Sequence, residues 1–191
     1  MKDLALWGNF LAGLGALSAL IISIFQIRRN SKFHEANFWL KLRQMFNEED
    51  RIYVHRELRK GTWISKTPID KSEWSKIEDY MGLMEVCEGM LQKKIISETV
   101  FKNLYEYRIY NICCNKQVVH QKLIYEYYDW HLFYRLLERL YGEDWKDFYT
   151  FISKAKIGYN QVKNENALLA KFDADQKIQY SYFIKKLNIE L

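Results

Sequence analysis

LALWGNFLAGLGALSALIISIF, the stretch from Leu4 to Phe25, contains no charged side chain. As a helix rising about 1.5 Å per residue it is about 33 Å long, which matches a bilayer core of about 30 Å. A cleaved signal peptide is the alternative, but its apolar region is shorter, about 7–15 residues, and an Ala-x-Ala cleavage site is missing here. We therefore expect a retained transmembrane anchor in residues 1–27 and a separate domain in residues 28–191.

The residues flanking this run predict its orientation. Arg28 and Arg29 follow it closely and form a stop-transfer pattern, with Lys32 just beyond. Because positive charge accumulates on the cytoplasmic side of membrane helices, residues 28–191 are expected in the cytoplasm. The three cysteines, if left as thiols, agree with a reducing compartment.

The predicted membrane helix has one face of small residues. At about 100° per residue, eight small or polar residues fall within one arc: Ala5, Gly8, Asn9, Ala12, Gly15, Ala16, Ala19 and Ser23. Small residues allow membrane helices to pack closely, so we expect this face to contact other copies of the chain. The alternative is that Ala and Gly are simply frequent in membrane helices. Asn9 would either line a narrow pore or hydrogen-bond a neighbouring helix.

The remainder of the chain predicts an all-α domain. It has a single proline and only eight glycines in 191 residues, whereas a β-sandwich or barrel needs a turn about every 8–12 residues. Apolar residues recur with helical spacing. Aromatic residues make up 16% of the chain, and we expect most of them in the core and some at subunit contacts.

Helix boundaries follow from capping residues and glycines. We expect the segment 31–46 to be helical and residues 61–70, with Pro68, to form a loop. Asp70 with Glu73, and Asp173 with Gln176, have capping-box spacing. The other expected helices run from Asn47 to Gly61, from Asp70 to about Lys94, from Ser97 to about Cys113, through 116–141, over 144–156 and over 174–187. The character of 157–172 is ambiguous.

The sequence contains little that supports a metal site, a cofactor site or a catalytic nucleophile. Cys113, Cys114 and His120 form the only nearby set of metal-ligating residues, and adjacent helical cysteines point about 100° apart. The sequence contains neither CxxC nor HExxH for a metal, no glycine-rich phosphate loop and no GxSxG. We therefore predict no metal site and no cofactor.

The sequence contains one catalytic pattern, the Arg-x4–6-His spacing of HEPN-type ribonucleases. In those enzymes Arg and His act on the 2′-hydroxyl and the scissile phosphate by acid–base chemistry. Arg29 and His34 fit the spacing, beside the membrane. Asn115 and His120 form a degenerate match that lacks the guanidinium needed to stabilise the phosphate charge. These four residues are the weak catalytic candidates.

Several patterned segments resemble a family of small bacterial single-pass helical proteins of unknown function. They are FWLKL at 38–42, RIYVHREL at 51–58, KIEDYMGLMEVCEG at 76–89, LQKKIISETVFKNLYEYRIY at 91–110 and the region 130–140. The layout is also similar to the membrane accessory proteins of type VI-B CRISPR systems. That resemblance implies a divergent HEPN-like helical domain, the bacterial inner membrane as location, and a homo-oligomeric pore that depolarises the membrane beside an RNA-guided ribonuclease.

The sequence is therefore consistent with three alternative functions. The first is a non-enzymatic pore-forming membrane effector in antiviral defence, whose partners are its own copies, the lipid bilayer and an RNA-guided CRISPR ribonuclease. The second is a membrane-tethered HEPN-like ribonuclease, and the third is a passive scaffold that recruits a cytosolic partner. Nucleic-acid binding has no strong signal, because the net charge of +5 is dispersed over short basic pieces.

Overall fold

The structure is all-α, as predicted. The computed structural model describes residues 26, 33, 35–155 and 164–189, and all regular structure among them is helical. The chain divides into two compact units, residues 1–45 and residues 46–191. In the first unit residues 35–45 are helical, as expected for the segment 31–46.

The predicted membrane anchor falls outside this description. The run from Leu4 to Phe25 and the predicted boundary after residue 27 both lie in residues that the structure does not describe. Among the described residues, no helix is both long enough and apolar enough to cross a bilayer.

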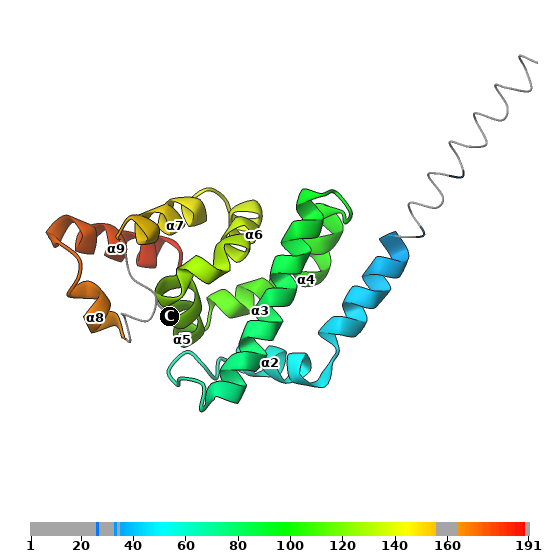
Figure 1. Ribbon diagram of the computed structural model, residues 1–191, viewed down its shortest axis with the longest axis horizontal. Helices are drawn as coiled ribbons and strands as arrows, with labels where there is room; N and C mark the ends of the chain where they lie inside the picture. Colours follow the sequence, from blue (N-terminus) through cyan, green and yellow to red (C-terminus); the bar gives the residue numbers. More distant parts are fainter. Residues whose placement is uncertain (1–25, 27–32, 34, 156–163, 190–191) are drawn as a thin grey trace, which may run out of the picture. The chain divides into compact units, whose positions relative to one another are not determined.

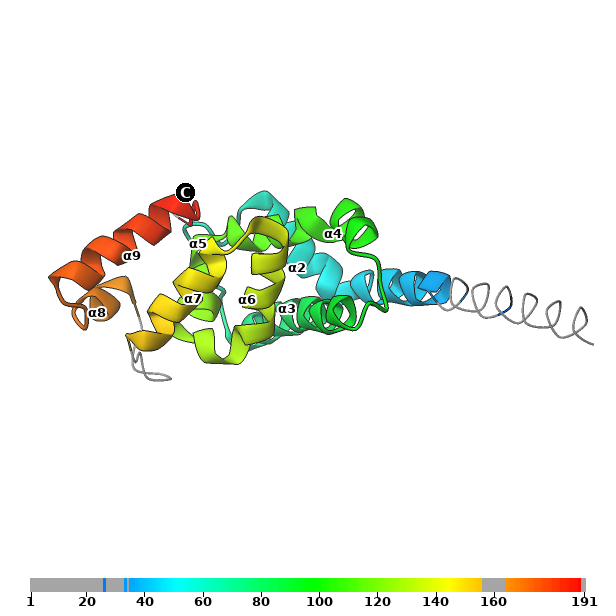
Figure 2. The ribbon, with the colours of Figure 1, turned by 90° about the horizontal axis from the view of Figure 1, so that it is seen from above.

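The second unit is a succession of short helices in which neighbours along the chain often pack together (Figures 1 and 2). Helix α3 packs against α2 and α6, α2 also contacts α4, and α6 packs against α7. The elements are α2 (Glu49–Lys60), α3 (Lys71–Gln92), α4 (Glu98–Cys113), α5 (Lys116–Val118), η1 (Val119–Tyr125), η2 (Tyr127–Trp130), α6 (His131–Tyr141), α7 (Asp144–Lys154), α8 (Glu165–Leu169) and α9 (Ala174–Lys186).

The predicted start of α2 is wrong by one residue. Glu48, not Asn47, is the N-cap, and its side chain makes no capping hydrogen bond. The acidic first turn, Glu49 and Asp50, instead places negative charge at the positive end of the helix. The predicted end is confirmed at Gly61, whose φ of 70° is left-handed and therefore suits a residue without a Cβ.

Side-chain caps confirm the predicted starts of α3, α4 and α9. Ser97 caps α4, and Asp173 and Gln176 form the full capping box at the start of α9. At α3 only half of the box forms. Asp70 accepts a hydrogen bond from the Glu73 backbone N–H at 2.9 Å, but the Glu73 carboxylate accepts from the Ile69 backbone and is therefore not available to Asp70.

The segment 116–141 is not the single helical stretch that its composition predicts. It changes from α-helix to π-helix at Val119, to 3₁₀-helix at Tyr127 and back to α-helix at His131. The Glu85 carboxylate of α3 accepts a hydrogen bond from the Phe133 backbone N–H at 3.0 Å and so satisfies a donor in the first turn of α6. A hydrogen bond to helix α3 therefore helps to form the start of α6, and the local sequence alone did not reveal this contact.

Aromatic rings supply many of the buried side chains among the described residues. One group joins α3 and α4 with Phe46, which stacks on Tyr105 at 4.7 Å and meets Tyr80 edge-on at 6.0 Å. Another joins α7 and α9 through Phe148 and Phe183, whose ring centroids lie 5.5 Å apart. Large rings bury much apolar area per residue, so a few of them fill the space between short helices.

Candidate functional site

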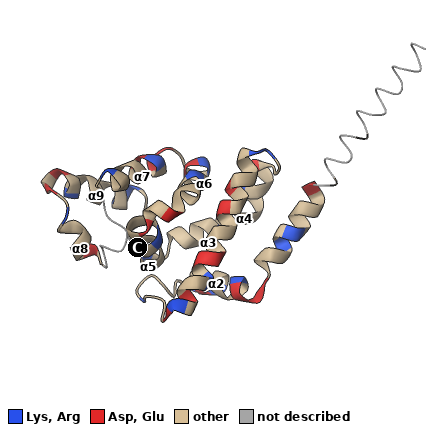
Figure 3. Cartoon of the chain, in the orientation of Figure 1, with Lys and Arg blue, Asp and Glu red and all other residues tan. Residues whose placement is uncertain are grey.

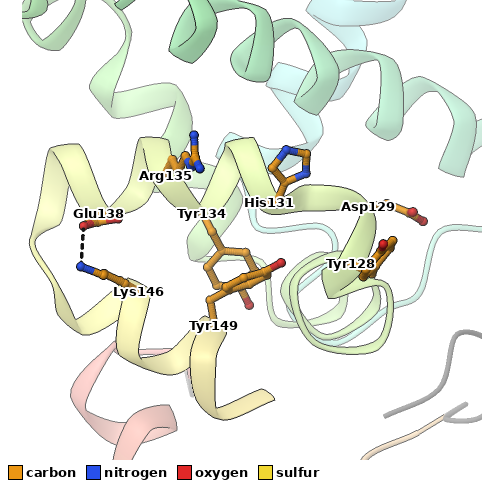
Figure 4. A pocket seen from close by; sticks show the side chains of 8 residues that line it. All are labelled: Tyr128, Asp129, His131, Tyr134, Arg135, Glu138, Lys146 and Tyr149. Carbon is orange, nitrogen blue, oxygen red and sulfur yellow. Dashed lines mark ion pairs between the residues drawn. The ribbon is translucent and has the colours of Figure 1, made fainter. Parts of the chain in front are cut away.

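An open pocket of about 650 Å³ lies among η2, α6 and α7 (Figure 4). We call it the tyrosine pocket. Three tyrosines, two basic residues, two acidic residues and one histidine line it: Tyr128, Tyr134, Tyr149, Arg135, Lys146, Asp129, Glu138 and His131. Its volume falls within the range of about 300–1,000 Å³ that is typical of small-molecule sites.

Tyrosine rings form the apolar part of this pocket. Tyr134 and Tyr149 lie with ring centroids 4.8 Å apart, and Tyr127 meets Tyr149 edge-on at 6.0 Å. The Tyr134 hydroxyl donates to the backbone carbonyl of Leu123, which fixes the ring, and burial raises its pKa well above the ordinary value. Burial also raises the pKa of Tyr149. Both tyrosines are therefore neutral at physiological pH.

Charges of both signs surround the rings. Lys146 and Glu138 form an ion pair at 3.7 Å, marked by the dashed line in Figure 4. Arg135 is exposed and makes no ion pair with the described residues, yet it lies close enough to Tyr149 to favour ionisation of its hydroxyl. An open cavity lined by aromatic rings and a few polar groups is typical of small-molecule sites. The pocket thus has the chemistry of a binding site.

A second arrangement lies between α2, α3 and α4, around the buried Arg108. Its Nη1 donates to the Tyr80 hydroxyl at 3.2 Å, and its Nε donates to the Tyr107 hydroxyl at 3.1 Å. The Tyr80 hydroxyl also lies 3.5 Å from Nδ1 of His55. The guanidinium sits 4.9 Å from the centroid of the Phe46 ring, in cation–π geometry. We call Arg108, His55, Tyr80 and Tyr107 the Arg108 cluster.

The chain matches no family model, no curated protein and no solved structure. The resemblances described for the sequence therefore remain expectations, and the candidate sites rest on their own geometry.

Most of the predicted site residues lie outside the part of the chain that the structure describes. These are the small-face residues Ala5, Gly8, Asn9, Ala12, Gly15, Ala16, Ala19 and Ser23, together with Arg28, Arg29 and His34. The roles predicted for them in self-association, topology and catalysis stay predictions.

Asn115 is described, and its side chain is fully buried in a structural clamp. Its Oδ1 accepts from the Trp63 backbone N–H at 3.1 Å, and its Nδ2 donates to the carbonyls of Leu58 and Asn111 at 2.9 and 2.7 Å. The amide thereby ties the end of α2 and the following loop to the end of α4. These contacts commit both polar atoms of Asn115 to the backbone.

His120, the proposed partner of Asn115, is also buried. It lies in the π-helix η1, and its Nδ1 is 3.5 Å from the Tyr125 hydroxyl. π-Helical turns occur often at functional sites, and the His120 ring meets the Tyr125 ring edge-on at 6.0 Å. Catalysis by this pair stays a prediction.

The Arg-x4–6-His pattern did not reveal the Arg108 cluster, because that pattern requires Arg and His to lie close together along the chain. No histidine follows Arg108 within six residues, whereas folding brings His55 of α2 to the hydroxyl that Arg108 binds. Tyr128 and Tyr134 in the segment 116–141, and Tyr149 in the next helix, likewise gave no hint of the tyrosine pocket, because aromatic residues are the usual core material of a helical domain.

Charge on the described helices is interspersed rather than gathered (Figure 3). Two buried ionic residues are paired: Lys122 bonds Glu78 and Glu126 at 2.6 and 2.7 Å, and Glu88 bonds Arg139 at 2.8 Å. No set of three or more His, Cys, Asp or Glu side chains placed to hold a metal occurs within residues 35–155 and 164–189.

Proposed function

We propose that this protein is a membrane-anchored effector that self-associates through residues 4–25 and forms a pore in the bacterial inner membrane. Its helical body would lie in the cytoplasm and work beside an RNA-guided CRISPR ribonuclease in antiviral defence. In this proposal the body is a divergent HEPN-like domain without enzymatic activity. The all-α architecture of the described residues supports the proposal at the level of fold class.

The observation that carries the proposal is the sidedness of the apolar run. The hydrophobic effect does not drive helices together within lipid, so association depends on close packing and polar contacts. A face that combines Gly8, Ala12, Gly15 and Ala19 with the polar Asn9 supplies both. In a ring each subunit contacts two neighbours through different surfaces, and a broad small-residue face suits that arrangement.

The test is dye leakage from liposomes that contain the purified full-length protein. Ala12→Leu adds bulk at the centre of the small face, whereas Gly13→Leu adds the same side chain at nearly the same depth but outside that face. We expect Ala12→Leu to abolish both leakage and oligomers seen by native mass measurement, and Gly13→Leu to retain both.

Other results would separate the alternatives. A correctly inserted, oligomeric protein that gives no leakage rejects the pore. RNA cleavage lost on His34→Ala or His120→Ala would support the ribonuclease instead. Full function after replacement of residues 4–25 by a generic membrane helix would support the passive scaffold.

A further inference from the structure

Arg108 carries a buried charge that no carboxylate of the described part of the chain neutralises. Arg108 is only 9% exposed, and none of the ion pairs among the described residues includes it. Its partners are two neutral phenol hydroxyls and the faces of aromatic rings. A buried charge is costly unless a partner of opposite charge accompanies it. Lys122, which is also buried, follows this rule with two carboxylates.

The guanidinium also has donors left over. Nε and Nη1 donate to the hydroxyls of Tyr107 and Tyr80, whereas Nη2 donates to no group of the residues that the structure describes. Nη2 is not among the buried polar atoms that lack a partner, so it reaches the solvent. Tyr107, whose hydroxyl Arg108 binds, is 48% exposed and forms the rim. A ligand can therefore approach the open edge of the guanidinium without displacing a protein partner.

The groups that surround the open Nη2 edge of the Arg108 guanidinium are neutral or positive. His55 comes from α2, Tyr80 from α3 and Tyr107 from α4. Burial, Arg108 and Arg59 together lower the pKa of His55 to about 4, and no carboxylate raises it. His55 is consequently neutral near pH 7, and the unopposed positive charge of Arg108 remains at the site.

We infer that the Arg108 cluster binds an oxyanion, specifically the phosphoryl group of free phosphate or of a small phosphorylated ligand. A tetrahedral phosphoryl oxygen would accept from Nη2 of Arg108, because a guanidinium presents several donors in a fixed fork that suits phosphate. A second oxygen would accept from the N–H of the neutral His55 ring, whose Nδ1 lies 3.5 Å from the Tyr80 hydroxyl. The anion would thus supply the charge that the cluster lacks, and binding it goes beyond the proposed membrane function.

The experiment is a thermal-unfolding titration of the full-length protein in nonionic detergent. Inorganic phosphate and adenosine monophosphate are compared with sodium chloride at equal ionic strength. At a ligand concentration of about 100 times Kd, the unfolding midpoint should rise by about 5–10 °C. A larger effect of adenosine monophosphate identifies a phosphorylated small ligand as the source, and an equal effect identifies phosphate itself.

Variants assign the effect to the cluster. Arg108→Met should abolish the rise, whereas Arg43→Met, which removes an exposed arginine that belongs to neither the Arg108 cluster nor the tyrosine pocket, should retain it. If Arg108→Met does not fold, Arg108→Lys replaces it as the test variant, because lysine keeps the charge but lacks the forked donors. We expect Arg108→Lys to bind phosphate and adenosine monophosphate at least about tenfold more weakly than the unaltered protein, as measured by calorimetry.

An independent readout is the NMR titration of the His55 ring, because a bound anion should move its pKa up from about 4. The inference is overturned if neither phosphate nor adenosine monophosphate shifts the unfolding midpoint of the unaltered protein beyond the chloride control. It is also overturned if Arg108→Met or Arg108→Lys binds as tightly as the unaltered protein.

Discussion

Replacing Asn115 by Ala should remove a large part of the stability of the helical body. The Trp63 backbone N–H, which now donates to Oδ1, would be left without its acceptor in a residue that is 1% exposed. Such an unsatisfied buried donor costs about 1–3 kcal/mol. The two hydrogen bonds donated by Nδ2 contribute about 0.5–1.5 kcal/mol each.

These contributions are not fully additive. The Leu58 carbonyl also accepts from the Gly61 backbone N–H at 3.1 Å, so it keeps one partner after the substitution. We therefore expect the free energy of unfolding to fall by about 3–5 kcal/mol, within the range seen when a buried hydrogen-bond network is broken. Urea denaturation of the full-length protein in nonionic detergent, followed by tryptophan fluorescence, measures this loss as a lower midpoint.

Two further variants make the measurement specific. Asn111→Ala lies one turn earlier in α4 and keeps the carbonyl that Asn115 binds, so it should change stability by less than about 0.5 kcal/mol. Asn115→Asp keeps the acceptor for Trp63 but loses both donors, and its carboxylate would face two carbonyl oxygens. Its stability should improve as the pH falls, because protonation restores one donor. A loss below about 1 kcal/mol for Asn115→Ala would refute the clamp.

Three other perturbations test the ionisable groups of the body. Arg139→Met leaves the Glu88 carboxylate, which is 1% exposed, without its cation and should lower the unfolding free energy by about 3–5 kcal/mol in urea; an unchanged midpoint contradicts this. Burial raises the pKa of Cys87 to about 12, so iodoacetamide at pH 8 should alkylate the partly exposed Cys114 and spare Cys87, as read by peptide mass spectrometry; equal labelling argues against the packing of α3. The depressed pKa of His55, about 4, means that the unfolded chain binds a proton more readily than the folded one, so stability should fall as the pH drops from about 6.5 to 4. His55→Gln should flatten that dependence, and an unaltered slope would exclude this histidine as its source.

Much of the fold was accessible from the sequence because the relevant forces act over a few residues. Ser97 and Asp173 cap helices where their spacing predicted, and Gly61 ends α2 in a left-handed conformation. Capping and backbone preferences involve groups within one turn of each other, so the chain shows them directly. The one-residue error at Asn47 falls within the usual uncertainty of helix ends.

The candidate sites were less accessible, because each depends on residues from different helices. The tyrosine pocket combines side chains of η2, α6 and α7. Two of these elements, η2 and α6, arise from the change of helix type within 116–141. The sequence showed the aromatic residues there but not which rings face a cavity. Asn115 was noted as a degenerate catalytic residue, and only its contacts with Trp63 and Leu58 reveal the clamp.

By itself the sequence determined the all-α class, most helix ends and the presence of one long uncharged apolar run, since each follows from composition or from short-range periodicity. Only the tertiary structure decided that Arg108 is buried without a carboxylate from residues 35–155 or 164–189, and that His55, far away along the chain, lies beside its tyrosine partner. The physical reason is that burial and counter-ion pairing are properties of the packed interior, where groups distant in sequence meet after water has been excluded.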